Sequence, residues 1–252
     1  LVGQATAEKT NSGIILLMSP PGGGKTIFCR QMITDCLDSG SMCIYINSSM
    51  TRKEYGKLFN NIADAKIKNL KFLNPYLVTT GNKESNTSDS INDPKLSATL
   101  QEIRNSIEDW SSSVTNTIEG TQHGSTSTLN DLPNCAIVLD SLTHMFTLFE
   151  EDKVLKFVNA LSFLIKEFES LALITMSGTQ SNNESILNKL SSIFDILLEI
   201  EIQEDSDKIN RKLKLISIKG ASSKSTSALF NIDQEGILKF ESEASPKPKL
   251  SI

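Results

Sequence analysis

Short apolar runs alternate with helical-period segments along the first third of the chain. Residues 14–18 form a continuous apolar run, and apolar residues then recur at helical spacing from 27 to 37 until Gly40 ends the pattern. A second apolar run over 42–46 and a shorter one over 70–72 predict two further strands. Thr51 and Glu54 stand in capping-box spacing, which predicts that a helix begins between these two strands.

The same alternation returns in the second half of the chain. The runs "CAIVLDS" at 135–141 and "LALITMS" at 171–177 predict buried strands, and an amphipathic pattern between them predicts a helix over 154–168. A short helix at 186–190 and a strand at 194–202 follow. Strands that are apolar throughout are typical of parallel sheets covered by helices on both faces.

The last strands have a different pattern. Residues 212–220, "KLKLISIKG", alternate between polar and apolar side chains, and "TSALFNI" is followed by the turn "DQEG" and the short run "ILKF". This pattern predicts an antiparallel hairpin at the edge of the sheet. The expected fold class is therefore α/β, with a mostly parallel central sheet flanked by helices, in a single domain over 1–240 with a loose tail at 241–252.

Residues 81–130 interrupt this domain with a segment rich in Ser, Thr, Asn and charged residues. A helix from Pro94 through Trp110 is the ordered part that the pattern predicts there. Residues 85–90 and 122–127 are too polar to bury surface that would offset the entropy of ordering them, so we expect mobile loops. The segment is a polar, partly mobile insertion or a flexible lid.

Composition argues against several classes of protein. A net charge of -5 and a pI near 5.2 argue against a general binder of phosphate backbones, and we find no strong nucleic-acid signal. The four cysteines include no Cys-x-x-Cys pair, which favours free thiols in a reducing cytosol over a metal site. No apolar run reaches the roughly 18 residues that span a bilayer, and no signal segment follows Leu1. We therefore expect a cytoplasmic protein without a transmembrane segment.

The stretch "SPPGGGKT" at 19–26 lies where a predicted strand gives way to a predicted helix. It matches the phosphate-loop pattern G-x-x-x-x-G-K-[ST], except that Ser19 replaces the first glycine. Consecutive glycines let amide groups turn toward the phosphates of a nucleotide, and the positive end of the helix attracts the same charge. Lys25 would reach the β- and γ-phosphates, and the Thr26 hydroxyl would bind Mg²⁺. A plain turn would not require Lys-Thr, so the predicted nucleotide-binding residues are Ser19, Pro20, Pro21, Gly22, Gly23, Gly24, Lys25, Thr26 and Ile27.

Asp140 ends the predicted strand "CAIVLD". In phosphate-loop proteins a carboxylate at this place helps to hold magnesium. The predicted metal is therefore Mg²⁺, bound by Thr26 directly and by Asp140 through a water molecule; the alternative is that Asp140 only caps a neighbouring turn. The next residue is Ser141 rather than Glu, so a general base has to be sought elsewhere in the chain.

Three stretches together carry a resemblance to a known family: "MSPPGGGKTIFCRQMITDCLDSGSMCIYINSS", "CAIVLDSLTHMF" and "KLKLISIKGASS". They resemble the RecA superfamily, and most of all the single-domain members of its KaiC-like branch, across most of residues 12–240. The resemblance implies a RecA-like P-loop fold, binding of ATP or ADP with Mg²⁺, and assembly into a homo-oligomer or with a protein partner. Archaellum motor-associated KaiC-like proteins are among the relatives it suggests, which would place the chain in the cytoplasm or at the cytoplasmic face of a membrane-bound assembly.

The chain departs from the family's pattern at the expected catalytic positions. KaiC-like ATPases end their second core strand with one or two glutamates that position the attacking water, and in "YINSSMT" Ser48 and Ser49 occupy those positions. Glu54 is near in sequence, but its capping-box spacing favours a helix cap over a substitute base. The family carries a Lys and an Arg that approach a neighbouring subunit's nucleotide, and Ser217 and Lys219 stand there instead. Lys219 is thus a candidate contact in trans or an ordinary exposed charge.

Other polar residues lie near the ends of the predicted strands. Ser177 and Gln180 follow "LALITM" and could sense the γ-phosphate, or they are polar only because the strand has left the core. His144 lies among apolar neighbours in "LTHMF", which favours a packed or solvent-edge histidine over a catalytic one.

These observations favour a nucleotide-dependent assembly or regulatory switch that binds Mg·ATP and hydrolyses it slowly or not at all. A positioned general base contributes about 10²- to 10⁴-fold to a rate, and the residues that would supply it are replaced. The alternative is an active ATPase whose base is Glu54 or comes from the insertion. A DNA-pairing recombinase relative would need basic loops, and a phosphotransferase an arginine-rich lid, whereas Arg104 is the only arginine between positions 53 and 210.

Overall fold

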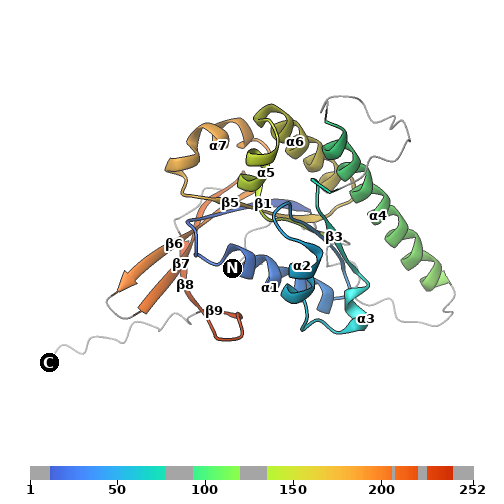
Figure 1. The fold of residues 1–252 in the computed structure, drawn as a ribbon, viewed down its shortest axis with the longest axis horizontal. Coiled ribbons are helices and arrows are strands. Elements are labelled where there is room, and N and C mark those ends of the chain that lie inside the picture. Colours follow the sequence, from blue (N-terminus) through green and yellow to red (C-terminus); the bar gives the residue numbers. More distant parts are fainter. Residues whose placement is uncertain (1–11, 78–92, 120–134, 206–207, 221–225, 241–252) are drawn as a thin grey trace.

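The computed structural model describes residues 12–77, 93–119, 135–205, 208–220 and 226–240. In Figure 1 a single twisted sheet runs through the molecule with helices on both faces. Within these residues the sheet has nine strands in the order β3-β2-β4-β5-β1-β6-β7-β8-β9. Because the first six strands run parallel to one another, each connection between consecutive strands crosses over the sheet and contains at least one helix.

Six strands are parallel to one another and three at one edge are antiparallel. The four strands at the centre of the parallel set, β2, β4, β5 and β1, are apolar and buried almost throughout, whereas β3 and β6 include charged residues and the edge strands mix polar with apolar residues. The parallel set is β1 (Gly13–Ser19), β2 (Met42–Ile46), β3 (Leu70–Leu73), β4 (Cys135–Leu139), β5 (Leu171–Ser177) and β6 (Ile196–Asp205), and the edge strands are β7 (Lys208–Ile218), β8 (Thr226–Ile232) and β9 (Leu238–Phe240).

Helices cover the two faces of the sheet and enclose two apolar cores. One core packs under α1 (Lys25–Asp38), α2 (Arg52–Leu58) and α3 (Asp64–Ile67). The other packs under α4 (Pro94–Glu119), α5 (Leu142–Leu148), α6 (Glu151–Glu167) and α7 (Glu184–Leu190). A short 3₁₀ turn at Ser181–Asn183 precedes α7.

The predicted α/β class, the mostly parallel sheet and the C-terminal antiparallel strands are confirmed. The pattern did not predict α3 or α5, which are only four and seven residues long and lack a periodic signal. The predicted loops at 85–90 and 122–127 and the tail at 241–252 lie outside the described residues.

Helix α4 is a structural part of the fold rather than an element separate from the core. It extends to Glu119, nine residues beyond the predicted end at Trp110. Leu96, Ile103 and Ile107 are completely or almost completely buried in the core shared with α6. Bidentate hydrogen bonds from Arg104 to Glu167, at 2.9 and 2.7 Å, also join α4 to the end of α6. This part of the predicted insertion therefore covers the sheet.

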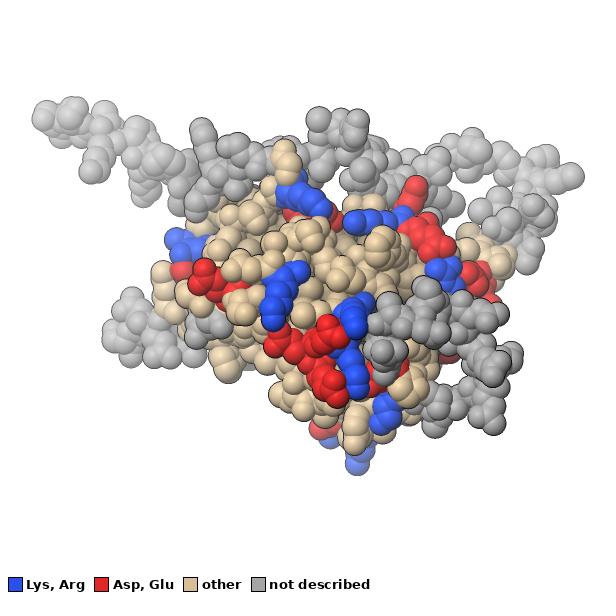
Figure 2. All heavy atoms as spheres, turned by 90° about the horizontal axis from the view of Figure 1, so that it is seen from above, with Lys and Arg blue, Asp and Glu red and all other residues tan. Residues whose placement is uncertain are grey.

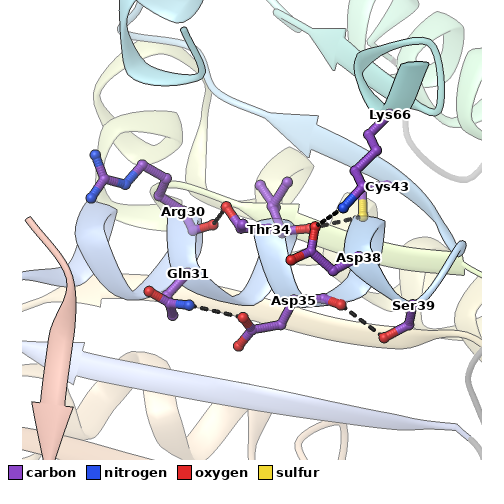
Figure 3. Close-up of polar contacts among 9 residues, drawn as sticks. Arg30, Gln31, Thr34, Asp35, Asp38, Ser39, Cys43 and Lys66 are labelled. Carbon is purple, nitrogen blue, oxygen red and sulfur yellow. Dashed lines mark hydrogen bonds and ion pairs between the residues drawn. The ribbon is translucent and has the colours of Figure 1, made fainter. Parts of the chain in front are cut away.

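An ion pair and side-chain hydrogen bonds attach α1 to neighbouring elements. Lys66 of α3 reaches Asp38 in the last turn of α1 with an N–O distance of 2.6 Å, as Figure 3 shows. Near the other end, the Arg30 guanidinium donates to the carbonyl groups of Glu235, at 3.1 Å, and Gly236. The turn between β8 and β9 is thereby held against the helix that follows the phosphate loop.

The outer face of helices α4 to α7 carries charges of both signs. Lysine and arginine side chains stand beside aspartate and glutamate in Figure 2, without a continuous basic stripe among the residues drawn in colour. Clustered positive charge supplies most non-specific affinity for nucleic acids. No helix within the described ranges is both long and apolar enough to cross a membrane.

The packing of α4 predicts that its buried residues contribute strongly to stability. Ile103→Ala removes a completely buried side chain, so we expect the free energy of unfolding to fall by about 2 to 5 kcal/mol. Asp109→Ala, on the exposed face of the same helix, should change it by less than about 0.5 kcal/mol. Denaturant titration measures both values, and an Ile103→Ala protein as stable as the Asp109→Ala control would contradict a core role for α4.

Candidate nucleotide-binding site

The carboxyl ends of the parallel strands meet at one edge of the sheet. Met18 of β1 pairs with Met176 of β5, and Ile46 of β2 pairs with Leu139 of β4, so the loops that follow these strands emerge side by side. Ligands of open α/β sheets bind at this edge, where the backbone leaves the sheet. The structure therefore brings the predicted phosphate loop, Asp140 and Ser177 together at the place where a ligand would bind.

The glycines of the phosphate loop are required by its backbone and by its packing. Gly22 and Gly24 have φ angles of 80° and 100°, a region that residues with a Cβ atom adopt at a cost. Gly23 has no such angle, but a Cβ atom there would lie 1.8 Å from the Oγ atom of Ser19 and 3.2 Å from the Pro20 carbonyl oxygen. The chain can therefore turn closely enough to present its amide groups inward.

Ser19 fits the loop although the general pattern has glycine at this position. Its side chain is fully buried, and the hydroxyl group donates to the Pro20 carbonyl at 2.9 Å. Its own carbonyl accepts hydrogen bonds from the Gly178 amide and from the Lys25 ammonium group, both at 2.9 Å. The substitution therefore fills space above Gly23 and leaves the course of the loop intact.

The first turn of α1 is open to an anion. Gly24 is the N-cap and supplies no side-chain cap, and the first turn contains no acidic residue. The amide groups of that turn have no acceptor within the helix and carry the positive end of its dipole. Lys25 also bonds to the Pro20 carbonyl at 3.3 Å, and burial lowers the pKa of its ammonium group while the Asp140 carboxylate acts in the opposite direction.

Asp140 is the most heavily bonded carboxylate of the site. It is only 5% exposed, and three hydroxyl groups donate to it. Thr26 and Tyr45 reach Oδ2 at 2.8 and 2.9 Å, and Thr175 reaches Oδ1 at 2.8 Å. Burial, followed by the nearby Asp140 charge, raises the pKa of Tyr45, so its hydroxyl group stays protonated and donates.

These groups suit a magnesium ion that accompanies a nucleotide. Mg²⁺ prefers hard oxygen ligands and is bound by one or two protein groups together with phosphate oxygens and water. The Thr26 hydroxyl and the Asp140 carboxylate are oxygen ligands of this kind, and they lie within hydrogen-bond distance of each other. The residues present therefore fit the ion predicted from the sequence.

The loop after β2 contains amide and hydroxyl groups where the family resemblance implies glutamates. Asn47 is buried, and its Oδ1 atom accepts hydrogen bonds from the backbone amides of Ser49 and Met50, both at 2.8 Å, and from the Ser49 hydroxyl at 2.9 Å. The Ser48 Oγ atom is buried without a hydrogen-bond partner in the described part of the chain. The side chains at 47–50 thus fix the loop and include no carboxylate.

Glu54 forms the helix cap that its spacing predicts. Its carboxylate accepts a hydrogen bond from the Thr51 amide at 2.8 Å, and the Thr51 hydroxyl accepts one from the Glu54 amide at 3.3 Å. Two hydrogen bonds from Thr51 lower the pKa of the exposed Glu54 carboxyl group. The bond from the Thr51 amide has the larger effect, and the bond from the Thr51 hydroxyl adds to it. The carboxylate is therefore occupied at the start of α2.

Arg211 of β7 is a site residue that the sequence argument did not include. Its Nη2 atom donates to the Gly22 carbonyl at 3.4 Å, and its Nε atom is buried without a partner among the described residues. A buried donor without an acceptor costs about 1 to 3 kcal/mol, so this group suits a site that receives an anion. Ile232 of β8 packs against the loop as well. Its Cδ1 atom lies so near Gly24 that a Cβ atom at position 24 would be 2.8 Å away from it.

A family model described as "ATPase: KaiC" matches residues 10–244, which is nearly the whole chain. The chain belongs to the KaiC family. Among solved structures, the KaiC-like protein PH0186 from the hyperthermophilic archaeon Pyrococcus horikoshii OT3 matches with a TM-score of 0.64 and 13% identity, over 91% of this chain and 89% of that one. This match supports the fold alone, and no curated protein sequence matches the chain.

In this KaiC-family chain the remaining predicted positions occupy different parts of the site. The Ser177 amide donates a hydrogen bond to the Thr143 hydroxyl at 2.8 Å, and the Gln180 amide donates one to Glu199 at 3.3 Å. Ser177 is the last residue of β5, and Gln180 lies in the loop that follows it. Lys219 lies beyond the end of β7, where its ammonium group donates to the Ser192 carbonyl at 2.8 Å. The amide of His144 is part of the α5 cap formed by Ser141.

The missed residues Tyr45, Thr175 and Arg211 do have a signal in the sequence. Tyr45 and Thr175 carry polar atoms inside apolar strands, and such atoms are almost always hydrogen-bonded when buried. Arg211 falls on the apolar side of an alternating strand, two residues before Leu213. A polar side chain at a buried position shows that a hydrogen-bond partner exists, but only the pairing of the strands shows which residue that partner is.

Packing of the phosphate loop predicts an unequal response to two substitutions. Gly23→Ala places a methyl group on the Ser19 hydroxyl, so we expect about a tenfold loss of affinity for a fluorescent ATP analogue. Ser19→Gly should change the affinity little. Combining them should recover part of the loss, because the closest contact is removed; full additivity of the two effects in the titration would contradict the packing described.

Proposed function

We propose that this KaiC-family protein binds Mg·ATP and acts as a nucleotide-dependent assembly or regulatory switch with slow or absent hydrolysis. KaiC is a family of ATPases, and the P-loop fold supports nucleotide binding. The observation that carries the proposal is the contrast between two loops. The loop after β1 matches the phosphate-loop pattern and is followed by Thr26 beside Asp140, whereas the loop after β2 has amide and hydroxyl side chains and no carboxylate.

Each part of the phosphate loop has a role in this proposal. The backbone of the loop, from Ser19 to Gly24, surrounds the α- and β-phosphates, and the Lys25 ammonium group exchanges its carbonyl partners for phosphate oxygens. Thr26 and Asp140 hold Mg²⁺, which supplies charge neutralisation at the phosphates. Ile27 continues the open first turn of α1.

Slow hydrolysis follows from the residues after β2. If Ser48 and Ser49 stand where family members carry glutamates, the rate loses the contribution of a positioned base, about 10²- to 10⁴-fold. Binding does not depend on that base. A protein of this kind can hold ATP for long periods, and a ligand that binds one conformation preferentially shifts the population toward it.

Assembly in trans is supported by the position of Lys219. Ile196 pairs with Ile15 on one side and with Ile218 on the other, so Lys219 lies level with the amino end of β1. The Lys219 amide bonds to Asp195, whose own amide bonds to Ile14, so Ser19, where the phosphate loop begins, lies five residues further along β1, or about 17 Å. A contact between Lys219 and a nucleotide is therefore best made with the nucleotide of a neighbouring copy.

A second candidate function is an active ATPase with an unrecognised base, and one observation favours it. Glu199 of β6 is only 8% exposed and pairs with Met18, next to the start of the phosphate loop. A buried carboxylate at this edge could orient water, although it already accepts a hydrogen bond from the Gln180 amide. Association with an archaellum motor or with a membrane-bound assembly stays a prediction from the family resemblance.

Phosphate release measured together with ATP affinity tests the proposed function. We expect tight Mg·ATP binding with little release in the native chain, and loss of binding by at least tenfold in Lys25→Ala, because a charged contact to phosphate is removed. Glu54→Gln is the matched control and should bind as the native chain does. Retained tight binding in Lys25→Ala would contradict the assigned site. Robust release that Glu199→Gln abolishes would instead support the active ATPase.

Light scattering with and without Mg·ATP tests assembly. We expect the mass to increase when Mg·ATP is added, and the increase to be reduced in Lys219→Ala because one positive charge no longer meets the neighbouring nucleotide. Lys156→Ala, which removes a half-buried charge of α6 that pairs with Asp152, is the control and should assemble as the native chain does. An unchanged monomer under both conditions would contradict the assembly role while leaving nucleotide binding intact.

A further inference from the structure

One of the three hydroxyl groups on Asp140 connects this carboxylate to a second part of the site. The Tyr45 hydroxyl donates to Asp140 Oδ2 at 2.9 Å and accepts a hydrogen bond from the Asn47 side-chain amide at 3.1 Å. Both capacities of the phenol are therefore used. Tyr45, Asn47 and Asp140 are 0%, 3% and 5% exposed, so these bonds lie out of contact with bulk water.

Asn47 continues the connection into the loop after β2. While its Nδ2 atom donates to Tyr45, its Oδ1 atom accepts from the amides of Ser49 and Met50 and from the Ser49 hydroxyl. An amide side chain that serves four bonds has one orientation in which all of them are made. The position of the Tyr45 hydroxyl and the conformation of residues 47–50 are thus tied to each other.

An aromatic cluster fixes the ring of Tyr45. Tyr55 of α2 stacks on it with a centroid distance of 6.2 Å, Phe59 meets it edge-on at 5.5 Å, and Phe72 of β3 lies at 6.2 Å. Tyr55 and Phe72 also stack on each other at 4.5 Å. Displacement of the phenol would therefore be felt by α2, because a closely packed cluster transmits small shifts.

We propose that Tyr45 is a positioning residue that orients the magnesium-binding carboxylate Asp140 and relays its occupancy, through Asn47, to residues 47–50. The inference rests on the proposed function, because it assumes that Mg·nucleotide binds at Asp140. It adds the route by which binding changes a surface outside the phosphate loop. Residues 47–50 and the exposed start of α2 are then the part of the switch that a partner can read.

The physical basis of the relay is competition at one carboxylate oxygen. Asp140 Oδ2 already serves the hydroxyl groups of Thr26 and Tyr45, whose hydrogens carry partial positive charge. A cation held by Thr26 and Asp140 draws on the same negative charge. The Tyr45 hydroxyl also accepts a hydrogen bond from Asn47, so a change in its bond to Asp140 reaches the loop after β2.

Magnesium-dependent affinity is the first readout. Tyr45→Phe removes the hydroxyl group and keeps the ring, and Tyr55→Phe is the control within the same aromatic cluster. Binding of a fluorescent ADP analogue is measured with excess Mg²⁺ and again with EDTA. We expect the gain in affinity that Mg²⁺ provides to be about tenfold smaller in Tyr45→Phe than in the native chain, while the affinity in EDTA is unchanged. Tyr55→Phe should match the native chain under both conditions.

Hydrogen exchange of the backbone amides is the second readout, and it tests the relay itself. Exchange of the Ser49 and Met50 amides reports whether their bonds to Asn47 open. In the native chain we expect Mg·ADP to change this exchange at least threefold. In Tyr45→Phe the change should disappear, although Mg·ADP is supplied at saturating concentration.

The outcomes separate this inference from the proposed function. If the native chain fails to bind Mg·ADP, the proposed function is wrong and the relay falls with it. If the native chain binds and Tyr45→Phe shows the same magnesium gain and the same exchange response, the relay alone is wrong. A Tyr45→Phe protein with lower thermal stability but an unchanged magnesium gain would show a merely structural role and would also overturn the proposal.

Discussion

The carboxylate of Asp140 imposes the constraint on which the rest of the site depends. An ionised group that is almost completely buried is tolerated only when hydrogen bonds replace its hydration. Its three donors come from α1, β2 and β5, so the order and register of these elements have to bring three hydroxyl groups to one point. The central strands of the sheet are thus arranged around the same group that would hold magnesium.

The C-terminal strands contribute to the site as well as to the edge of the sheet. Ile232 of β8 packs against Gly24, and Arg211 of β7 donates to the Gly22 carbonyl. Arg30 of α1 donates to the turn between β8 and β9. These contacts fix the phosphate loop from the side that the parallel strands do not reach. The antiparallel extension is therefore one wall of the candidate nucleotide site, and a change in that extension would alter the packing of the loop.

The parts of the site that sequence reasoning identified are local in the chain. Lys25 and Thr26 were predicted because a phosphate loop is a contiguous motif, and Asp140 because a carboxylate directly follows a buried strand. The cap formed by Glu54 is equally local and was predicted correctly. Tyr45, Thr175 and Arg211 were missed because each contributes through a partner distant in sequence. The bond from Tyr45 to Asp140 spans 95 residues, and that from Arg211 to Gly22 spans 189.

By itself the sequence determined the strands, most of the helices and the class of fold, because hydrophobic periodicity reports which side of each element is buried. It also determined the phosphate loop, whose chemistry lies in neighbouring residues. Only the tertiary structure decided that α4 belongs to the core, that three hydroxyl groups converge on Asp140, and that Lys219 lies at the opposite end of the sheet from its own phosphate loop. Each of these depends on which strands pair and in what register, and pairing is a non-local property that periodicity along the chain does not contain.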